Sequence, residues 1–534
     1  STEAQVYEDW FQAVVNLRDA LPQDKRSDAY KYSGELRSVC AAMMGKMKTG
    51  EDVAKVYDII SRTYLFEAKD VFDSYCIYLE WNRAPEKKFY QPRRKVLRTV
   101  ANALQDLADD RLDLLAISMP PGCGKTALAI FYLTWLAGRT PDEPMLTGSH
   151  SNSFVRGVYD ECLRIFDKDG EYLWNDVFPD VTVSNTNAKD CRIDLGKRKR
   201  FETLEFTSIG TGNAGLYRAS TLLYCDDLVS GIEVALSKPR LDKLWETYTT
   251  DLRQRKIGNK CKELHIATRW SVHDVIGRLE QNYGDSDRNR FIVMPAMNEK
   301  DESNFDYDYG VGYSTETLRK QREVMDEMSW KALYMNQPVE REGLLFPADE
   351  LRYFNGVLPD GEPDRKLMVM DIAWGGGDFT ACPIAYVYGD AVFIPDLVFN
   401  NGDKTVTRPE VVGKIIQHKI NVVRGEANNG GDEYCDVVDS QLRQQGYHCS
   451  VRSQRAPSGQ SKLSRIIQYA PDIKRFYFLD EKHQSKEYKA FMEQVTMFTQ
   501  LGKVPHDDAP DSLAQLADEL YNGISKIEPV KRPF

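Results

Sequence analysis

The sequence predicts an α/β protein with a helical segment at its N-terminus. Three observations lead to this prediction. Residues 1–84 carry apolar side chains at roughly helical spacing, with little proline or glycine. From Leu114 onward, short apolar runs end in small, polar or acidic residues and alternate with helical stretches, as buried parallel strands with ligand-binding ends do. After a stretch rich in proline and glycine, the same pattern starts again at Lys366.

Length and composition fit a globular protein of several domains. The chain has 534 residues, which corresponds to about two to four domains. Hydrophobic residues make up 42% and charged residues 28%. No run approaches the roughly 18 consecutive apolar residues of a membrane helix, and the N-terminus lacks the pattern of a signal peptide.

The ten cysteines are scattered, and no two form a CxxC pair. Their spacing argues against a zinc site and against a disulfide framework, and it favours reduced thiols in a cytosol.

The net charge of −11 is unfavourable for binding nucleic acid, which usually requires a basic surface. A local basic run, Lys197–Arg200, could still contact phosphates, although a solvated hairpin turn is an equally good interpretation. Metal and ATP centres also need clustered carboxylates, so the net charge does not decide between functions.

We expect four regions along the chain. Residues 1–84 form a helical region, 85–345 a first α/β domain, 346–365 a linker and 366–534 a second α/β domain. In the last region, residues 383–388 and 391–395 predict two strands around a Gly389–Asp390 hairpin turn.

Residues Ser118–Thr126 have the composition and the context of a P-loop, because they follow an apolar strand and open a helical run. Backbone N–H groups of the loop would bind phosphates, Lys125 would reach the β- and γ-phosphates, and Thr126 would hold Mg²⁺. The strict pattern has glycine where this chain has Met119. The expected nucleotide-binding residues of the loop are Pro121, Gly122, Cys123, Gly124, Lys125 and Thr126.

Two acids follow the apolar run 221–225. Asp226 would complete the Mg²⁺ shell, and Asp227 would polarise the attacking water. Most ATPases of this kind have glutamate at the second position, and aspartate is one methylene shorter.

Two further residues are candidates for contacting ATP. Thr268 ends another strand, where a hydroxyl could sense the γ-phosphate, although it could equally cap the following turn. Gln91, upstream of the P-loop, could bind adenine through its amide.

A second set of acids lies in the C-terminal region. Asp371 and Glu426 end two predicted strands, and Asp508 and Asp511 begin a helix on one face or at its cap. Acids from two strands and one helix form the RNase H-like arrangement, in which two divalent ions bind the scissile phosphate. The alternative is that these residues are scattered surface acids among the 81 Asp and Glu residues.

The order of motifs resembles that of the large terminase subunits of tailed bacteriophages over about residues 72–525. The segments that carry the resemblance are Glu80–Arg83, Phe89–Tyr90, Met119–Thr126, Asp226–Asp227, Thr268–Asp274, Gly277–Leu279, Tyr334–Pro338, Glu342–Gly343, Asp371–Ala373 and Gly377–Ala381. The departures are Met119, Asp227 and the first 70 or so residues.

The resemblance implies a P-loop (RecA/ASCE-like) ATPase domain followed by an RNase H-like nuclease domain with two Mg²⁺ or Mn²⁺ ions. It also implies a ring, most often of five subunits, on a capsid portal in the host cytoplasm. Such a ring would move double-stranded DNA into a procapsid, cut concatemers and work with a small terminase subunit. Family rings are thought to supply an arginine to the neighbouring ATP, for which Arg156 is our candidate and Arg218 the reserve. Both could equally form surface salt bridges.

Two other function classes remain open. A repair helicase-nuclease would share both chemistries, but it needs a second RecA-like domain. The ~100 residues between Trp270 and the second α/β region are too few for one. A catalytically silent portal adaptor would not need Lys125, Thr126 or the acid set.

Overall fold

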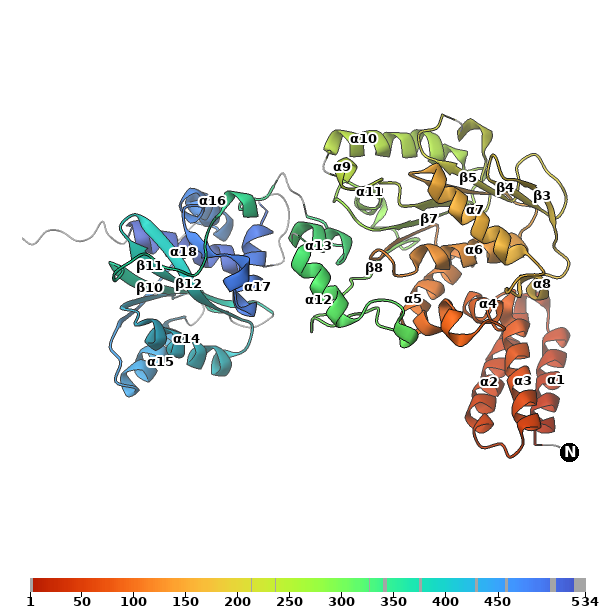
Figure 1. Cartoon of the computed structure of the whole chain (residues 1–534), viewed down its shortest axis with the longest axis horizontal. Helices are drawn as coiled ribbons and strands as arrows, with labels where there is room; N and C mark the ends of the chain where they lie inside the picture. Colours follow the sequence, from red (N-terminus) through yellow and green to blue (C-terminus); the bar gives the residue numbers. More distant parts are fainter. Residues whose placement is uncertain are drawn as a thin grey trace, which may run out of the picture. The chain divides into compact units, whose positions relative to one another are not determined.

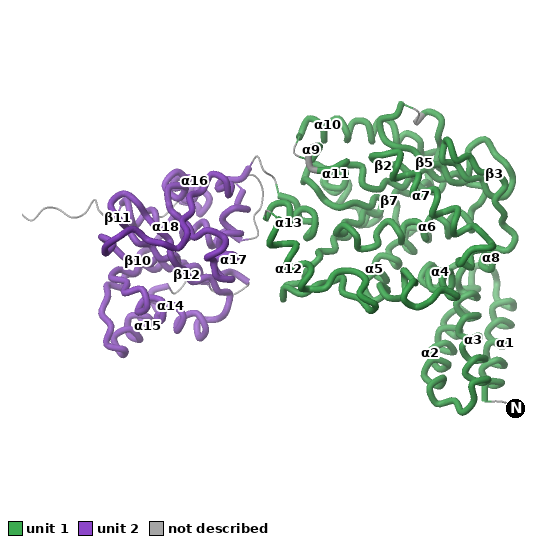
Figure 2. Tube along the Cα trace, viewed as in Figure 1, with its two compact units in different colours: residues 1–339 green, residues 340–534 purple. Residues whose placement is uncertain are grey.

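The computed structural model describes residues 3–212, 214–235, 237–325, 327–339, 343–373, 377–427, 431–456, 460–499 and 506–522. The chain divides into two compact units, residues 1–339 and 340–534 (Figure 2). Glu342, which belongs to one of the segments resembling terminases, lies outside the described residues.

Unit 1 begins with a bundle of three helices, α1 (Gln5–Ala20), α2 (Tyr30–Met44) and α3 (Gly50–Ala68), which lie side by side (Figure 1). Thr49 caps α3 by accepting the backbone N–H of Asp52. The bundle encloses its own core, with Phe11, Leu36 and Val56 all buried. The helical N-terminal segment is therefore confirmed.

An eight-stranded sheet forms the centre of unit 1. Its strands are β1 (Leu114–Ser118), β2 (Met145–Ser149), β3 (Val183–Asn187), β4 (Arg192–Leu195), β5 (Leu204–Ser208), β6 (Leu222–Asp226), β7 (Lys262–Ala267) and β8 (Asn289–Val293). The spatial order is β3-β4-β5-β2-β6-β7-β1-β8, and the strands from β5 to β8 in that order are parallel. The five strands β8-β1-β7-β6-β2 thus run 5-1-4-3-2 in chain order, which is the order of RecA-like P-loop folds of the ASCE class.

Alternate residues of these strands point to opposite faces of the sheet, so both faces are apolar. On one face, Leu115 and Ile117 pack with α5 (Tyr90–Ala108), α6 (Lys125–Arg139) and α7 (Asn152–Phe166). On the other face, Leu114 and Ala116 pack with α11 (Val275–Tyr283). The remaining helices of the unit are α4 (Phe72–Leu79), α8 (Trp174–Val177), α9 (Ile232–Ala235), α10 (Lys238–Thr247), α12 (Thr315–Val324) and α13 (Glu327–Leu333).

Unit 2 contains a seven-stranded mixed sheet. Its strands are β9 (Arg352–Phe354), β10 (Arg365–Met370), β11 (Thr380–Tyr388), β12 (Ala391–Asn400), β13 (Val422–Glu426), β14 (Ser450–Gln454) and β15 (Tyr477–Leu479). The order is β14-β13-β10-β11-β12-β15-β9. Strands β10, β11 and β12 are antiparallel, whereas β13 and β14 run parallel to β10. The five strands β12-β11-β10-β13-β14 run 3-2-1-4-5 in chain order, as in RNase H-like folds, so the predicted fold class is confirmed.

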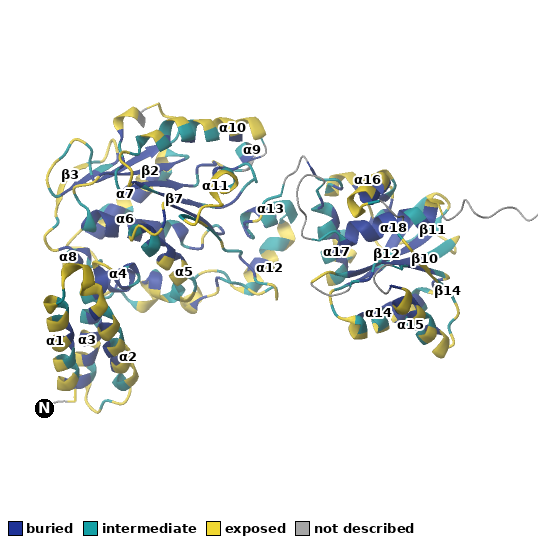
Figure 3. Ribbon diagram, turned by 180° about the vertical axis from the view of Figure 1, so that it is seen from behind, coloured by how far each residue is buried: buried dark blue, intermediate teal, exposed yellow. Residues whose placement is uncertain are grey.

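Helices cover both faces of the second sheet. Leu367 and Val369 pack with α16 (Lys462–Ile473), α17 (Lys486–Thr496) and α18 (Asp508–Asn522). Met368 and Met370 pack with α14 (Lys404–His418) and α15 (Gly431–Gln444) on the opposite face. Figure 3 shows the buried strands of each unit between helices whose outer faces are exposed.

The segment that we expected to be a linker, residues 346–365, belongs to the second unit. Phe346 is fully buried in its core, and β9 pairs with β15. The predicted hairpin at Gly389–Asp390 joins β11 and β12, which are both longer than the sequence indicated.

All ten cysteines carry free thiols, and nine of them are buried. Among the described residues, no helix is long and apolar enough to span a membrane.

Candidate functional site

The P-loop lies between β1 and α6, and its two glycines have backbone conformations that other residues rarely adopt. Gly122 has a φ of 72°, and Gly124, at the N-cap of α6, has a φ of 86°. A Cβ at Gly122 would stand 2.9 Å from the Tyr313 hydroxyl, and one at Gly124 would stand 2.6 Å from the ring of Phe89. Met119, where the strict motif has glycine, is fully buried in the core beneath the loop. Its side chain therefore replaces glycine without entering the space above the loop.

Lys125 and Thr126 connect the loop to the ends of β7 and β6. The Lys125 ammonium donates a hydrogen bond of 2.9 Å to Thr268 Oγ1 and one of 3.4 Å to the Pro120 carbonyl. The Thr126 hydroxyl donates to Asp226 Oδ2 over 3.0 Å. Four of the residues expected at the ATP site thus contact one another at the carboxyl edge of the sheet.

Asp226 is fully buried at the end of β6. Its Oδ2 also accepts a hydrogen bond from Tyr224, but its Oδ1 has no partner among the described residues. Burial, reinforced by the charge of Asp227, raises the pKa of the Asp226 carboxyl to about 7. An orphaned carboxylate oxygen beside a threonine hydroxyl is suited to holding Mg²⁺, which takes oxygen ligands.

Asp227 directly follows β6 and has a φ of 42°. Its backbone N–H donates to the Ile266 carbonyl over 3.0 Å, and its Oδ1 accepts the backbone N–H of Thr268 over 2.9 Å. His150 Nδ1 lies 2.6 Å from the Asp227 carbonyl oxygen. The shorter acid is therefore held against the end of β7, next to the Thr268 hydroxyl.

The Thr268–Asp274 segment contains a buried ion pair. Arg269 Nε lies 3.0 and 2.8 Å from the two carboxylate oxygens of Asp274, and both side chains are buried. Asp274 in turn caps α11 by accepting the N–H of Gly277. Arg269 is thereby fixed in the fold by Asp274 and does not serve as a free phosphate ligand.

The remaining ATP-site candidates lie apart from this cluster. Gln91 is exposed in the first turn of α5, and its side chain forms no hydrogen bond to another described residue. Arg156 is exposed on α7 and donates to the Ala188 carbonyl. Arg218 folds back onto the Tyr217 carbonyl over 2.6 Å. No contact joins Arg156 or Arg218 to the P-loop within the described part of the same chain.

Three acids of unit 2 lie close together. Asp371 follows β10, Glu426 ends the adjacent parallel strand β13, and Asp511 lies in the first turn of α18. Oxygens of these three carboxylates lie within 4.8 Å of one another. The fold thus brings together residues that lie as far as 140 positions apart in the sequence, from 371 to 511.

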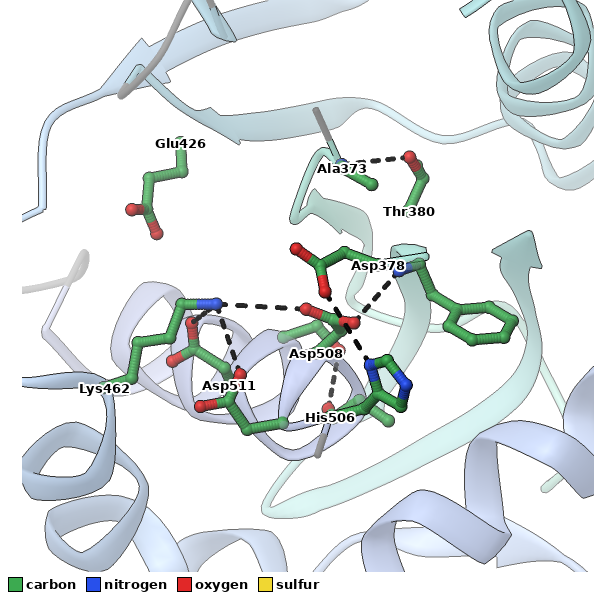
Figure 4. A network of polar contacts seen from close by, with 12 residues as sticks. Ala373, Asp378, Thr380, Glu426, Lys462, His506, Asp508 and Asp511 are labelled. Atoms are coloured by element: carbon green, nitrogen blue, oxygen red, sulfur yellow. Dashed lines mark hydrogen bonds and ion pairs between the residues drawn. The ribbon is translucent and has the colours of Figure 1, made fainter. Parts of the chain in front are cut away.

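A second group shares the start of α18. Ligand atoms of Asp378, His506 and Asp508 also lie within 4.8 Å of one another (Figure 4). Asp508 Oδ2 accepts the backbone N–H of Phe379 over 3.0 Å. From the sequence we named Asp508 as a ligand but missed Asp378 and His506, although Asp378 belongs to the Gly377–Ala381 segment and His506 lies two residues before Asp508.

Two basic residues of α16 face the first group. Arg465 donates to both oxygens of Asp511, over 2.8 and 2.7 Å, and to Glu426 over 3.1 Å. Lys462 Nζ lies 3.8 Å from Asp511 and 3.9 Å from Asp508 (Figure 4). We did not expect this pair from the sequence, where its only signal is the three-residue spacing that places both on one face of a helix.

The acid cluster is electrostatically unfavourable without a cation. Burial raises the pKa of Asp371 well above its ordinary value, and the charge of Asp511 adds to this effect. Burial also raises the pKa values of Asp508 and Asp511. Asp371 Oδ2 has no partner among the described residues. Divalent ions suit this set of hard oxygen ligands.

Similar proteins are found among solved structures, at low sequence identity. No protein-family model matches the chain, and no curated protein matches it. Among solved structures, it is similar to the large terminase of a thermophilic bacteriophage in complex with ADP, at 12% identity, covering 77% of this chain and 94% of that chain, with a TM-score of 0.29. It is also similar to the HK97 bacteriophage large terminase, at 12% identity, covering 71% and 85%, with a TM-score of 0.32.

The C-terminal unit has a further counterpart. The human cytomegalovirus terminase nuclease domain, Mn soaked and inhibitor bound, is 13% identical, covers 34% of this chain and 97% of that chain, and has a TM-score of 0.26. Because these identities and scores are low, the residue roles proposed below depend on the contacts within this chain.

Proposed function

We propose that this chain is a viral large terminase subunit, which uses ATP to move double-stranded DNA into a procapsid and cuts concatemeric DNA with a metal-dependent nuclease. One observation carries the proposal. Each unit carries, at or just after the end of a central strand, a carboxylate with a buried and unpartnered oxygen, which is Asp226 beside a P-loop and Asp371 within a cluster of acids. Two such centres on two different sheets fit a chain with both an ATPase and a nuclease activity.

In the ATPase site, Lys125 would bind the β- and γ-phosphates, while Thr126 and Asp226 would hold Mg²⁺. Asp227 would orient the attacking water, and Thr268, bonded to Lys125 and adjacent to Asp227, would respond to the γ-phosphate. The bound metal would neutralise charge that develops on the phosphates. Pro121, Gly122, Cys123 and Gly124 would present backbone N–H groups, and Gln91 would contact adenine.

In the nuclease site, Asp371, Glu426, Asp508 and Asp511 would hold two Mg²⁺ or Mn²⁺ ions. The metals would activate water and stabilise the leaving 3′ oxygen. Asp378 and His506 share Asp508 with this site and would complete the ligand set of one ion. Arg465 would keep Asp511 and Glu426 in place, because it hydrogen-bonds to both.

Translocation would require assembly into a ring, which we expect to have five subunits on the portal of a procapsid in the host cytoplasm. A small terminase subunit would be a further partner. The exposed Arg156 would reach the ATP site of the neighbouring subunit, with Arg218 as the second candidate.

The alternatives fit the structure less well. A helicase-nuclease needs a second RecA-like sheet. The described residues between Trp270 and β10 contain only the short strands β8 and β9, which belong to the two sheets already described. A silent portal adaptor would gain nothing from two carboxylates that each carry a buried, unpartnered oxygen, because such an oxygen costs stability.

The test combines two assays on the purified wild-type chain. Closed circular plasmid is incubated with Mn²⁺, with Mg²⁺ or with EDTA, and ATP hydrolysis is followed with and without double-stranded DNA. We expect metal-dependent cutting and ATP turnover from the same preparation. Turnover without cutting would leave only a motor, and absence of both would overturn the proposal.

A further inference from the structure

The start of α5 lies directly on the P-loop. Where a Cβ of residue 124 would stand, the ring of Phe89 is 2.6 Å away and Arg93 Cδ is 3.6 Å away. Gly124 is the N-cap residue of α6, so Arg93 stands beside the phosphate-binding end of this helix.

The guanidinium of Arg93 has aromatic neighbours and no acidic partner. Its central carbon lies 5.0 Å from the ring centroid of Phe89 and 6.0 Å from that of Tyr307. One nitrogen donates to the Phe89 carbonyl over 2.8 Å, and no ion pair of Arg93 exists among the described residues. The next residue differs, because Arg94 forms a salt bridge of 2.7 Å with Asp73. Burial lowers the pKa of Arg93, a half-buried cation, and the opposing charge of Glu80 does not offset this effect.

Tyr307 provides an independent sign of a missing ligand. Its side chain is only 6% exposed, and its hydroxyl has no hydrogen-bond partner in the described part of the chain. A buried hydroxyl without a partner is costly. Arg93 thus lies beside Gly124 of the P-loop without an ion pair among the described residues. The ring of Tyr307, whose hydroxyl has no partner there, lies 6.0 Å from the Arg93 guanidinium.

We infer that Arg93 and Tyr307 bind the nucleotide directly, at the Gly124 side of the loop, and that they contribute equally to the binding of ADP and of ATP. The inference rests on the ATP site proposed above. Lys125, Asp227 and Thr268 form a separate group, in which Lys125 and Asp227 both contact Thr268. No hydrogen bond joins that group to Arg93 or Tyr307 within the described residues. The planar guanidinium suits acceptor oxygens or ring nitrogens, and its aromatic neighbours cover its faces.

The inference is tested by equilibrium binding of ADP and of ATP to the full chain, by calorimetry without hydrolysis in the cold or in EDTA. The variants are Arg93→Gln and Tyr307→Phe, with Arg98→Gln as the matched control, because Arg98 is exposed on the same helix. We expect Arg93→Gln to weaken both nucleotides by about ten-fold or more, since it removes charge-assisted hydrogen bonds. Tyr307→Phe should weaken both by a few-fold, and Arg98→Gln should bind as the wild type does.

The other outcomes distinguish a destabilised variant, a wrong inference and a wrong ATP site. If Arg93→Gln lowers the unfolding temperature of the chain, its loss of affinity could come from misfolding. The nucleotide affinities of Tyr307→Phe then test the inference, because this change removes only one oxygen. Unchanged ADP affinity in both variants would overturn the inference, as would a loss confined to ATP, which would place Arg93 at the γ-phosphate. If the wild type binds neither nucleotide, the proposed ATP site is itself wrong.

Discussion

The ammonium of Lys125 donates a hydrogen bond of 2.9 Å to the hydroxyl of Thr268, which joins the P-loop to the end of β7. The two residues are 143 positions apart in the sequence. Because Thr268 also donates its backbone N–H to Asp227, a single residue connects the lysine proposed to bind phosphates with the acid proposed to orient water. If the proposed roles are right, a change at the γ-phosphate would act on the ends of both β6 and β7 through Thr268.

Lys125→Ala should abolish ATP turnover, with a loss of at least about 10²-fold, since it removes the cation that would stabilise charge on the transferred phosphate. The proposed nuclease site lies on a separate unit, so metal-dependent plasmid cutting should be unchanged. Steady-state ATP hydrolysis and plasmid cleavage on the same preparation measure both. Undiminished turnover would refute the assignment of the P-loop.

Thr268→Val should separate nucleotide binding from hydrolysis. Valine has nearly the same shape but lacks the hydroxyl that accepts from Lys125. We expect kcat to fall roughly ten-fold or more while ATP affinity changes little, because the phosphates would still bind the loop. Thr268→Ser keeps the hydroxyl and serves as the control. A variant with a normal kcat would mean that Thr268 only caps the turn.

Arg156→Ala should impair hydrolysis only in assembled rings, because Arg156 is exposed and contacts no residue of its own P-loop in the described chain. Mixing provides a sharp test. Lys125→Ala subunits cannot turn over ATP but would supply Arg156, whereas Arg156→Ala subunits have an intact P-loop. Under conditions where rings form, the mixture should exceed either variant alone.

The control for that experiment is Arg164→Ala on the same helix, where Arg164 pairs with Glu161 near the surface. If dilute, unassembled Arg156→Ala loses as much activity as the assembled protein, the arginine acts within its own subunit. If mixing restores nothing, Arg218 becomes the next candidate.

Asp371→Asn should stabilise the metal-free protein and remove its response to metal. The folded pKa of Asp371 is raised above its ordinary 3.8, so the stability associated with the protonated carboxyl is lost as pH rises above that value. In EDTA, the variant should therefore unfold at a higher temperature than the wild type, by a margin that grows between about pH 5 and pH 8.

Mn²⁺ should reverse this order. It should raise the unfolding temperature of the wild type, more at about pH 8 than at pH 5 because protons compete for the ligands, and leave Asp371→Asn unchanged. Scanning fluorimetry measures both effects, and Asp390→Asn, in an exposed turn, is the control. Equal metal responses in wild type and Asp371→Asn would show that the ion binds elsewhere.

The sequence predicted those parts of the sites in which strand pattern and residue chemistry coincide. Asp226, Asp371 and Glu426 were identifiable because each ends an apolar run, and the ends of neighbouring parallel strands meet at one edge of a sheet. The fold class followed from the same alternation of apolar strands and helices, and the strand orders agree with it.

Other residues could not be found in this way, because their roles depend on packing between distant segments. In the sequence, Arg465 and Lys462 have the pattern of the solvent-exposed face of an amphipathic helix. In the fold, both lie close to Asp511. Phe89 packs against Gly124 of the P-loop and Tyr307 lies beside Arg93, each from a separate segment of the chain, and no local pattern in the sequence marks either residue. Phe346 anchors the expected linker in the core of the second unit. Its burial could not be predicted from the sequence, because prolines and glycines surround it.

The most direct test of the central claim is cleavage of closed circular plasmid by wild type and Asp371→Ala in Mn²⁺, with ATP hydrolysis measured in parallel. Asp371 lies at the centre of the acid cluster, and its unit is distinct from the one that carries the P-loop. We predict that the variant loses metal-dependent cutting and keeps its ATP turnover. Full residual cutting by Asp371→Ala, or loss of both activities together in a folded variant, would contradict a chain with two separate catalytic centres.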